Sequence, residues 1–210
     1  MSARITVVDL EGLASYLTER PEVARKAARL AINDTASRKA VPTFRKSMQD
    51  QVAFPPGYLK DDRFGLTKEA IEADLTAVIT ARFRPTSLAR FAKGSKTKEG
   101  ARRAGGVRVG VKRGGARFMK GAFFVNLNRG KDTSDGFNLG LAIRLKPGQT
   151  LRGRRKGASG VQLAPDLYLL YGPSVDQVFR DVSTADGPKV ADQLEREFVR
   201  QWVRLNSSTI

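Results

Sequence analysis

The stretch GVRVGVKRGG, residues 106–115, alternates valine with glycine or a cation. Valines at every second position from Val107 give the pattern of a strand with one apolar and one polar face. The polar face carries Arg108 and Lys112, although serine or threonine would keep a strand equally wettable. The stretch therefore predicts a strand over residues 107–112 that ends in a glycine turn, and its cations need a reason of their own.

The positive charge continues on both sides of this strand. Residues 90–120 contain eleven Lys or Arg and one acid, and residues 144–156 contain six Lys or Arg and no acid. Charges cancel within residues 122–143, so residues 90–156 carry +16 of the chain's net charge of +17. A merely solubilising surface does not require this segregation. The pattern favours a polyanion such as duplex DNA, or an acidic protein surface, and charge alone does not separate these two.

Apolar periodicity predicts helices in the first 54 residues. Asp9 fits the N-cap of a short helix that follows a possible strand, and Pro21 fits the first position of a second, alanine-rich helix. Pro42 either kinks this helix or starts the next one. Residues 53–62, AFPPGYLKDD, then end the helical region with a rigid turn. Residues 66–74 are expected to hold one further helical turn.

The end of the chain also has helical spacing. Ser174 fits the cap of a helix, which the sequence Asp-Gly-Pro at residues 186–188 is expected to break. A final helix is predicted to run to about Leu205, with Leu194 and Phe198 on its apolar face.

The region between the helices reads as β structure. Alternation or apolar runs predict strands, in addition to the one at residues 107–112, at residues 75–83, 121–127, 137–145 and 167–172. The strand at residues 75–83 is expected to place Leu75, Ala77, Ile79, Ala81 and Phe83 on one face. Two basic, Gly-rich segments, residues 92–106 and 147–160, are predicted to be loops.

This order of helices, β meander and helices predicts an α+β fold. In it, an antiparallel sheet is covered by the N-terminal and C-terminal helices and extends two basic Gly-rich loops. We expect a single domain over residues 1–210. Its parts are a helical N-terminal part (1–54), the β meander with the basic loops (75–172) and the C-terminal helices (174–206).

The chain contains no cysteine and no histidine, which excludes thiol chemistry, disulfides and any His-assisted nucleophile. A metal-dependent nuclease would need carboxylates that converge on a metal ion. The closest acid pairs in the sequence are Asp61 with Asp62 and Asp132 with Asp135. Both pairs lie in turns rich in Gly or Pro, where Asp commonly bonds its own backbone. The glycines of residues 106–115 fit no nucleotide-binding motif. We therefore expect no enzyme, no cofactor and no metal.

Two further features bear on partners. No stretch approaches the roughly 20 apolar residues of a membrane span, and the N-terminus lacks a signal-peptide core, so we expect no membrane partner and function where the chain is made. Aromatic rings could serve as stacking platforms for bases. Core packing is favoured for them, because neither basic loop contains an aromatic residue, and single-strand binding is therefore not predicted. The rings concerned are Phe91, Phe118, Phe123, Phe124 and Tyr171.

Five stretches spread over most of the chain resemble, in the same order, the minor tail protein Z family of long-tailed phages, also called tail completion proteins. The combination of Gly-Ala-Phe, then Tyr-Gly-Pro-Ser-Val about forty residues later, then a terminal helix is the most specific part. The stretches are LAINDTASRKAV (30–41), GAFFVNLNRG (121–130), IRLKPG (143–148), LYGPSV (170–175) and QLEREFVRQW (193–202).

The resemblance implies a structural virion protein that completes the tail at its head-proximal end, in the tail or neck of the particle and in the host cytoplasm during assembly. It implies no catalytic residue. Its expected partners are other tail or neck proteins (tail terminator, connector or tube ring) and its own copies in a homo-oligomeric ring. The basic loops are expected to face either double-stranded DNA or the acidic surface of a neighbouring ring protein. The residues expected to face the polyanion or partner are Arg102, Arg103, Arg108, Lys112, Arg113, Arg152, Arg154, Arg155 and Lys156. The competing class is a free, non-sequence-specific duplex DNA-binding protein, such as a packaging or nucleoid accessory.

Overall fold

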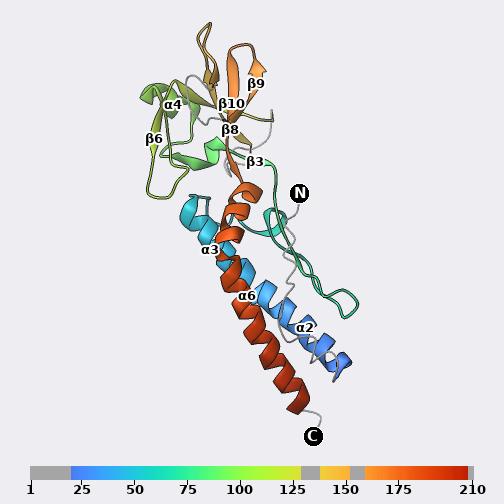
Figure 1. Cartoon of the computed structure of the whole chain (residues 1–210). Coiled ribbons are helices and arrows are strands. Elements are labelled where there is room, and N and C mark those ends of the chain that lie inside the picture. The colour runs from blue at the N-terminus through green and yellow to red at the C-terminus, as the bar shows by residue number, and fades with distance from the viewer. Residues whose placement is uncertain (1–19, 129–137, 152–158, 208–210) are drawn as a thin grey trace. The chain divides into compact units, whose positions relative to one another are not determined.

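The computed structural model of the chain describes residues 20–128, 138–151 and 159–207 (Figure 1). Helices lie at both ends of the described chain and antiparallel sheets lie between them, so the predicted α+β class is confirmed. The chain divides into two compact units. Unit 1 contains the described residues up to Met48, then Leu59–Phe83, then those from Val175 onward; unit 2 contains the described parts of Gln49–Tyr58 and Arg84–Ser174. The single-domain organisation stays a prediction.

The first helical region of unit 1 is continuous. Helix α2 spans Pro21–Thr35 with Pro21 in its first turn, as predicted, and a π-helical turn η1 (Ala36–Ala40) leads directly into α3 (Val41–Gln51). Pro42 lies in the first turn of α3. Because proline has no N–H for the carbonyl four residues earlier, the i→i−4 ladder is interrupted there, and the wider turn accommodates the interruption.

Helix α6 spans Val175–Ser207 as one element, so the predicted break at residues 186–188 is wrong. Pro188 lies inside the helix and points to solvent, while Val182, Val190 and Leu194 are buried on either side of it. The apolar stripe thus continues through the proline. Burial of that stripe outweighs the one backbone hydrogen bond that proline removes.

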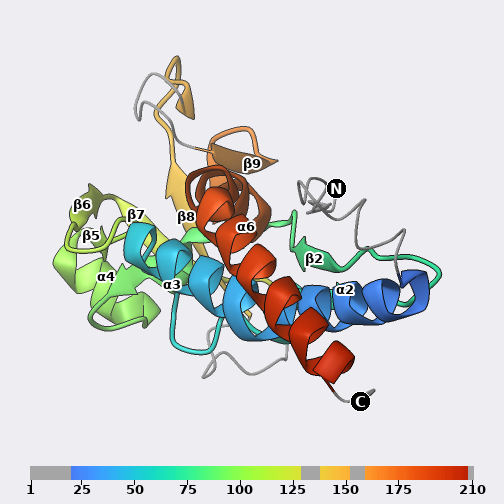
Figure 2. The same ribbon diagram turned by 60° about the horizontal axis from the view of Figure 1, so that its bottom comes forward.

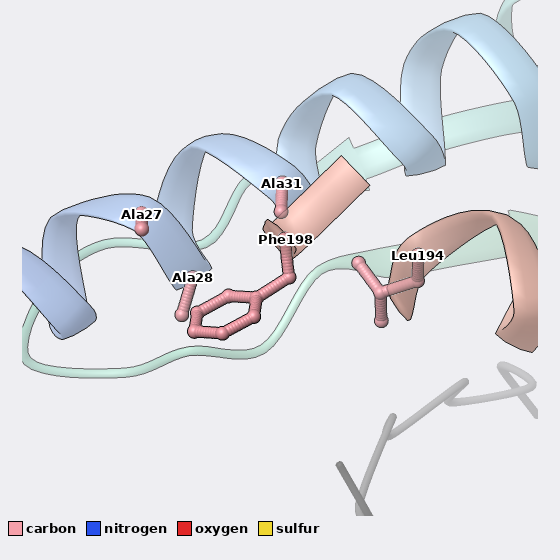
Figure 3. Packing of buried hydrophobic residues seen from close by; sticks show 5 residues of the cluster. All are labelled: Ala27, Ala28, Ala31, Leu194 and Phe198. Carbon is pink, nitrogen blue, oxygen red and sulfur yellow. The ribbon is translucent and has the colours of Figure 1, made fainter. Parts of the chain in front are cut away.

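Helices α2 and α6 lie side by side (Figures 1 and 2). Small side chains let the two backbones approach, and Phe198 of α6 points toward the alanines of α2 (Figure 3). The buried cluster of this interface consists of Ala27, Ala28, Ala31, Leu194 and Phe198. Ile32, Leu75, Trp202 and Leu205 pack against it and are partly buried.

Unit 1 also contains a two-stranded antiparallel sheet. After the 3₁₀ turn η2 (Asp61–Arg63), strand β1 (Phe64–Lys68) pairs with β2 (Val78–Ala81). The helical turn expected at residues 66–74 is therefore wrong. Residues 66–68 belong to β1, where the Thr67 hydroxyl donates a hydrogen bond to the carbonyl of Val78 (3.2 Å) across the strands, and Ile71 forms an isolated antiparallel bridge with Asp74.

The strand predicted at residues 75–83 is shorter than expected. Its inward face is confirmed at Ala77, Ile79 and Ala81, which are buried. Phe83, expected on the same face, is 63% exposed because it follows the end of β2.

Unit 2 contains a five-stranded antiparallel sheet in the order β3-β10-β8-β7, with β9 also paired to β10. The predicted strands at residues 121–127, 137–145 and 167–172 are confirmed as β7, β8 and β10. Strand β9 falls partly in the segment expected to be a loop, since its apolar residues point to solvent and give no core signal. The bounds are β3 Pro85–Ser87, β7 Ala122–Asn126, β8 Leu139–Arg144, β9 Ser159–Ala164 and β10 Leu167–Ser174.

A three-stranded antiparallel sheet, in the order β4-β5-β6, completes unit 2. Its strands are β4 (Ala92–Lys93), β5 (Gly106–Val109) and β6 (Arg117–Lys120), and a 3₁₀ turn η3 (Leu88–Phe91) precedes β4. The alternation of buried Val107 and Val109 with exposed Arg108 is as predicted, but the strand ends at Val109.

The segment expected to be a loop at residues 92–106 contains a helix, α4 (Lys98–Ala104). The Thr97 hydroxyl accepts a hydrogen bond from the N–H of Gly100 (3.0 Å) as an N-cap, and Gly105 ends the helix in the left-handed conformation with φ of 67°. Ala101 is its only buried residue, which explains why hydrophobic spacing did not indicate it.

Candidate functional site

Unit 2 contains a groove of about 770 Å³ that is lined by cations. Three chain segments form it: residues 49–56, residues 90–96 and the turn at residues 112–116. We call it the basic groove. Its lining cations are Arg90, Lys93, Lys96, Lys112 and Arg113.

Backbone hydrogen bonds bring these segments together. The N–H of Gly110 donates to the carbonyl of Phe91 (2.9 Å), and the N–H of Ala53 donates to the carbonyl of Val111 (2.8 Å). Gly110 is required for this packing, since a Cβ there would lie 2.6 Å from the carbonyl oxygen of Gly115 and 3.1 Å from Cε of Lys93. The groove is thus built by segments far apart in the sequence.

Packed aromatic rings form part of the wall of the basic groove. The buried Phe54 ring stacks on Tyr58 with 5.6 Å between centroids, and lies 5.9 Å from the ring of Phe91. The guanidinium of Arg90 lies over the Tyr58 ring at 5.1 Å, a cation–π contact that orients it. The turn AFPPGYLKDD therefore supplies part of the site, a role that its Pro-Gly composition did not indicate.

The charge of the groove is largely uncompensated. Arg113 pairs with Asp50 through a 2.7 Å contact between a guanidinium nitrogen and Oδ1. Within the described residues, Lys93, Lys96 and Lys112 have no carboxylate at ion-pair distance. Cations held close together without counter-charges repel each other, and a bound anion relieves that repulsion.

The structure brings together only two of the predicted site residues in this groove, Lys112 and Arg113. Arg102 and Arg103 lie exposed in the last turn of α4, and Arg108 lies on the exposed face of β5. The other four, Arg152, Arg154, Arg155 and Lys156, lie outside the described residues. Sequence reasoning did not single out the groove residues Arg90, Lys93 and Lys96, although they belong to the charged stretch it identified.

The exposed face of the three-stranded sheet adds a second feature. Lys93, Arg108 and Phe118 are paired in register across β4, β5 and β6, and all three are exposed. Phe118 is 48% exposed, so its expected place in the core is wrong. Among the other rings, Phe91 and Phe124 are buried as expected, and Phe123 and Tyr171 are half-buried.

Unit 1 contains a polar groove of a different kind, of about 540 Å³, where α2 and η1 face α6. Here acids and cations pair: Arg200 donates to Glu197 (2.9 Å from Nε to Oε2) and lies 3.8 Å from Asp34, which also contacts Arg38. The hydrogen bond from Arg200 holds the pKa of Glu197 below its usual value, against the opposing effect of burial, and Gln201 adds to the lowering.

The buried acid Asp186 links α6 to α3 within unit 1. A hydrogen bond with the Ser47 side chain, followed by one from Lys189 (2.9 Å), lowers the pKa of Asp186. Asp186 is 9% exposed and was expected to help break the helix. It acts instead as a tether between two helices.

The acids considered for metal chemistry are Asp61 with Asp62 and Asp132 with Asp135. Within the part of the chain that the structure describes, no group of three or more Asp or Glu is placed to hold a metal ion. Asp132 and Asp135 lie outside that part. No helix in the described ranges is both long enough and apolar enough to span a membrane.

Comparison of the chain with protein-family models, with curated proteins and with solved structures gives no match.

Proposed function

We propose that this chain is a structural virion protein, a minor tail or tail completion component that acts at the head-proximal end of a phage tail, and that it is not an enzyme. The basic groove of unit 2 faces either the DNA that enters the tail or the acidic surface of a neighbouring ring protein. The observation that carries this proposal is the set of groove lysines without an acidic partner among the described residues, Lys93, Lys96 and Lys112, together with two arginines. The ordered resemblance to tail completion proteins supplies the biological setting.

Such a groove suits a partner that needs no base-specific reading. Lys and Arg contact phosphates through charge and position, which gives affinity without sequence preference. Copies arranged in a ring multiply weak contacts, so each groove needs only modest affinity. The homo-oligomeric ring is part of the proposal.

The same groove supports a second candidate, a free duplex DNA-binding protein that accompanies packaging or organises DNA. The two candidates differ in their need for neighbours. A tail component occupies a fixed place in the particle and contacts other tail or neck proteins there, whereas a DNA accessory follows the nucleic acid.

An image of the intact particle would distinguish the two. For a tail component, we expect density for this chain at the junction of head and tail, with unit 2 within contact distance of DNA or of acidic side chains. Absence of the chain from purified infectious particles would contradict the proposal and favour the DNA accessory.

A titration against random duplex DNA tests the groove itself. If all five groove cations contact phosphates, affinity should fall roughly 500-fold as salt rises from about 50 to 200 mM. The double variant Lys96→Ala/Lys112→Ala should reduce the slope of log K against log salt by about 1.8. Its matched control, Lys26→Ala/Lys39→Ala, removes two exposed lysines from unit 1 and should leave duplex binding unchanged.

An acidic protein partner gives a different result. No duplex binding by the native chain at low salt would exclude the DNA-facing form of the proposal and leave the acidic neighbour. Equal losses in the groove variant and in the unit 1 control would contradict a role for the groove altogether.

A further inference from the structure

We propose that the exposed face of the three-stranded sheet in unit 2 binds single-stranded nucleic acid, with an unpaired base stacked on Phe118 and adjacent phosphates on Arg108 and Lys93. This inference rests on the nucleic-acid-facing form of the proposed function and deepens it. It assigns to the sheet a recognition of unpaired bases that the basic groove does not provide.

The three side chains form one row. Lys93 of β4 pairs with Arg108 of β5, and Arg108 pairs with Phe118 of β6. Directly opposed residues in an antiparallel sheet project from the same face about 5 Å apart. The row therefore presents two cations and one ring side by side.

The tip of the Phe118 ring lies over Gly106, and the ring stays 48% exposed. A Cβ at Gly106 would lie 2.9 Å from Cζ of Phe118, so the tip of the ring lies against bare backbone. Met119, the next residue, points to the opposite face and is buried, which fixes the outward direction of Phe118. An apolar ring at 48% exposure loses contact with water when a base covers it.

The row is continuous with the basic groove. Lys93 belongs to both, because it lines the groove and is the first member of the row. A single-stranded nucleic acid whose phosphates follow the basic groove thus reaches Arg108 and then Phe118.

The combination of a ring and cations selects the occupant. A duplex end or side offers phosphates but keeps most base faces stacked, so it would use the cations and not Phe118. An acidic peptide would also use only the cations. A single strand supplies both a phosphate and a free π face, and base–aromatic stacking tolerates any sequence.

The test compares a fluorescent oligothymidylate of about 12 nucleotides, a length within the usual site size, with a duplex of the same length. We expect Phe118→Ala to weaken single-strand binding by about 5- to 150-fold and to leave duplex affinity and the salt slope unchanged. Phe118→Tyr, which keeps the ring, should bind as the native chain does. Phe118→Leu, which keeps only an apolar side chain, should resemble Phe118→Ala.

The matched control is Phe83→Ala. Phe83 is a 63% exposed ring that belongs to unit 1, whereas the charged row belongs to unit 2. Its removal should not change the binding of either nucleic acid. Thermal unfolding of every variant checks that Phe118→Ala remains folded, as expected for an exposed side chain.

The possible results separate this inference from the proposed function. If Phe118→Ala binds the single strand like the native chain while Lys96→Ala/Lys112→Ala binds both nucleic acids more weakly, the stacking site is wrong and the groove stands. If Phe118→Ala loses single-strand binding while the groove variant loses nothing, the sheet face stands and the groove is wrong. Equal retention by Phe118→Leu, or an equal loss of duplex binding in Phe118→Ala, would also overturn stacking.

Discussion

The two units of the chain use charge in opposite ways. Unit 1 contains 18 Lys or Arg against 16 Asp or Glu, whereas unit 2 contains 20 against 5. In unit 1 the acids are drawn into pairs, such as Asp34 and Glu197 with Arg200. In unit 2 the groove lysines have no such partners within the described residues. Paired charges orient helices, while unpaired cations repel each other and are useful mainly to an external anion.

The two units also differ in where they place their aromatic rings. In unit 1 the rings of Phe44, Phe64 and Phe179 pack edge to face in the core, and Phe198 fills the interface of α2 with α6. In unit 2 the exposed ring of Phe118 lies in one row with Lys93 and Arg108, whereas the exposed ring of Phe83 in unit 1 follows the end of β2. We therefore interpret unit 1 as the rigid support and unit 2 as the part that meets the partner.

The largest effect is expected for Phe198→Ala, which tests unit 1 as the rigid support. Phe198 is 2% exposed, and its truncation leaves a cavity between α2 and α6 that costs about 3–5 kcal/mol of unfolding free energy. Urea unfolding would measure it. A loss below about 1 kcal/mol would contradict the packing of this interface.

A groove substitution comes next, because it strains unit 2 where the three segments meet. Gly110→Ala places a Cβ 2.6 Å from the carbonyl oxygen of Gly115, so the turn must shift, at a cost of roughly 1–3 kcal/mol. Duplex binding should weaken as the groove cations separate. Gly114→Ala is less suitable as a control because φ there is 76°. Gly187→Ala in α6 meets no atom within 4 Å and should be tolerated.

Acid should affect unit 1 through its paired carboxyl groups. The folded chain holds the pKa of Glu197 and of Asp186 below their ordinary values of 4.5 and 3.8. The unfolded state therefore binds protons first as the pH falls, so stability is constant above about pH 5 and is lost progressively below it.

The variant Glu197→Gln checks this assignment. It should be less stable than the native chain at neutral pH and should show a smaller loss between about pH 5 and pH 3. Glu195→Gln, at an exposed position of the same helix, is the control and should leave the profile unchanged. An identical acid profile for Glu197→Gln and the native chain would contradict the role given to the Arg200 contact.

Local patterns in the sequence predicted those features that a few neighbouring residues determine. The start of α2 at Pro21 and the inward face of Ala77, Ile79 and Ala81 follow from steric rules and alternation. Helix α6 was divided wrongly at Pro188, because packing on both sides of the proline is not visible in a local window. Propensity yields to burial in such cases.

For the candidate site, the sequence predicted the concentration of positive charge but not the arrangement of the residues. Sequence reasoning located the basic stretch but not the groove, since Phe54 and Phe91 meet through long-range packing. It also placed Phe118 in the core, although alternation with Met119 requires one of the two to face outward. A four-residue strand does not reveal which face is covered, and that is a property of the fold.

The smallest effect is expected where the contrast between the units is weakest, at the Asp50–Arg113 pair. Asp50 pairs with the groove cation Arg113, and both side chains are more than half exposed. An exposed pair of this kind contributes about 0–1 kcal/mol, so Asp50→Asn should hardly change the unfolding free energy. It should instead tighten duplex binding, because it releases Arg113 and removes one negative charge beside the groove. Arg113→Ala is the companion variant and should weaken binding at equal stability. If Asp50→Asn left binding unchanged while Arg113→Ala weakened it, the arginine would contact the anion with the pair intact, and Asp50 would orient Arg113 without masking it.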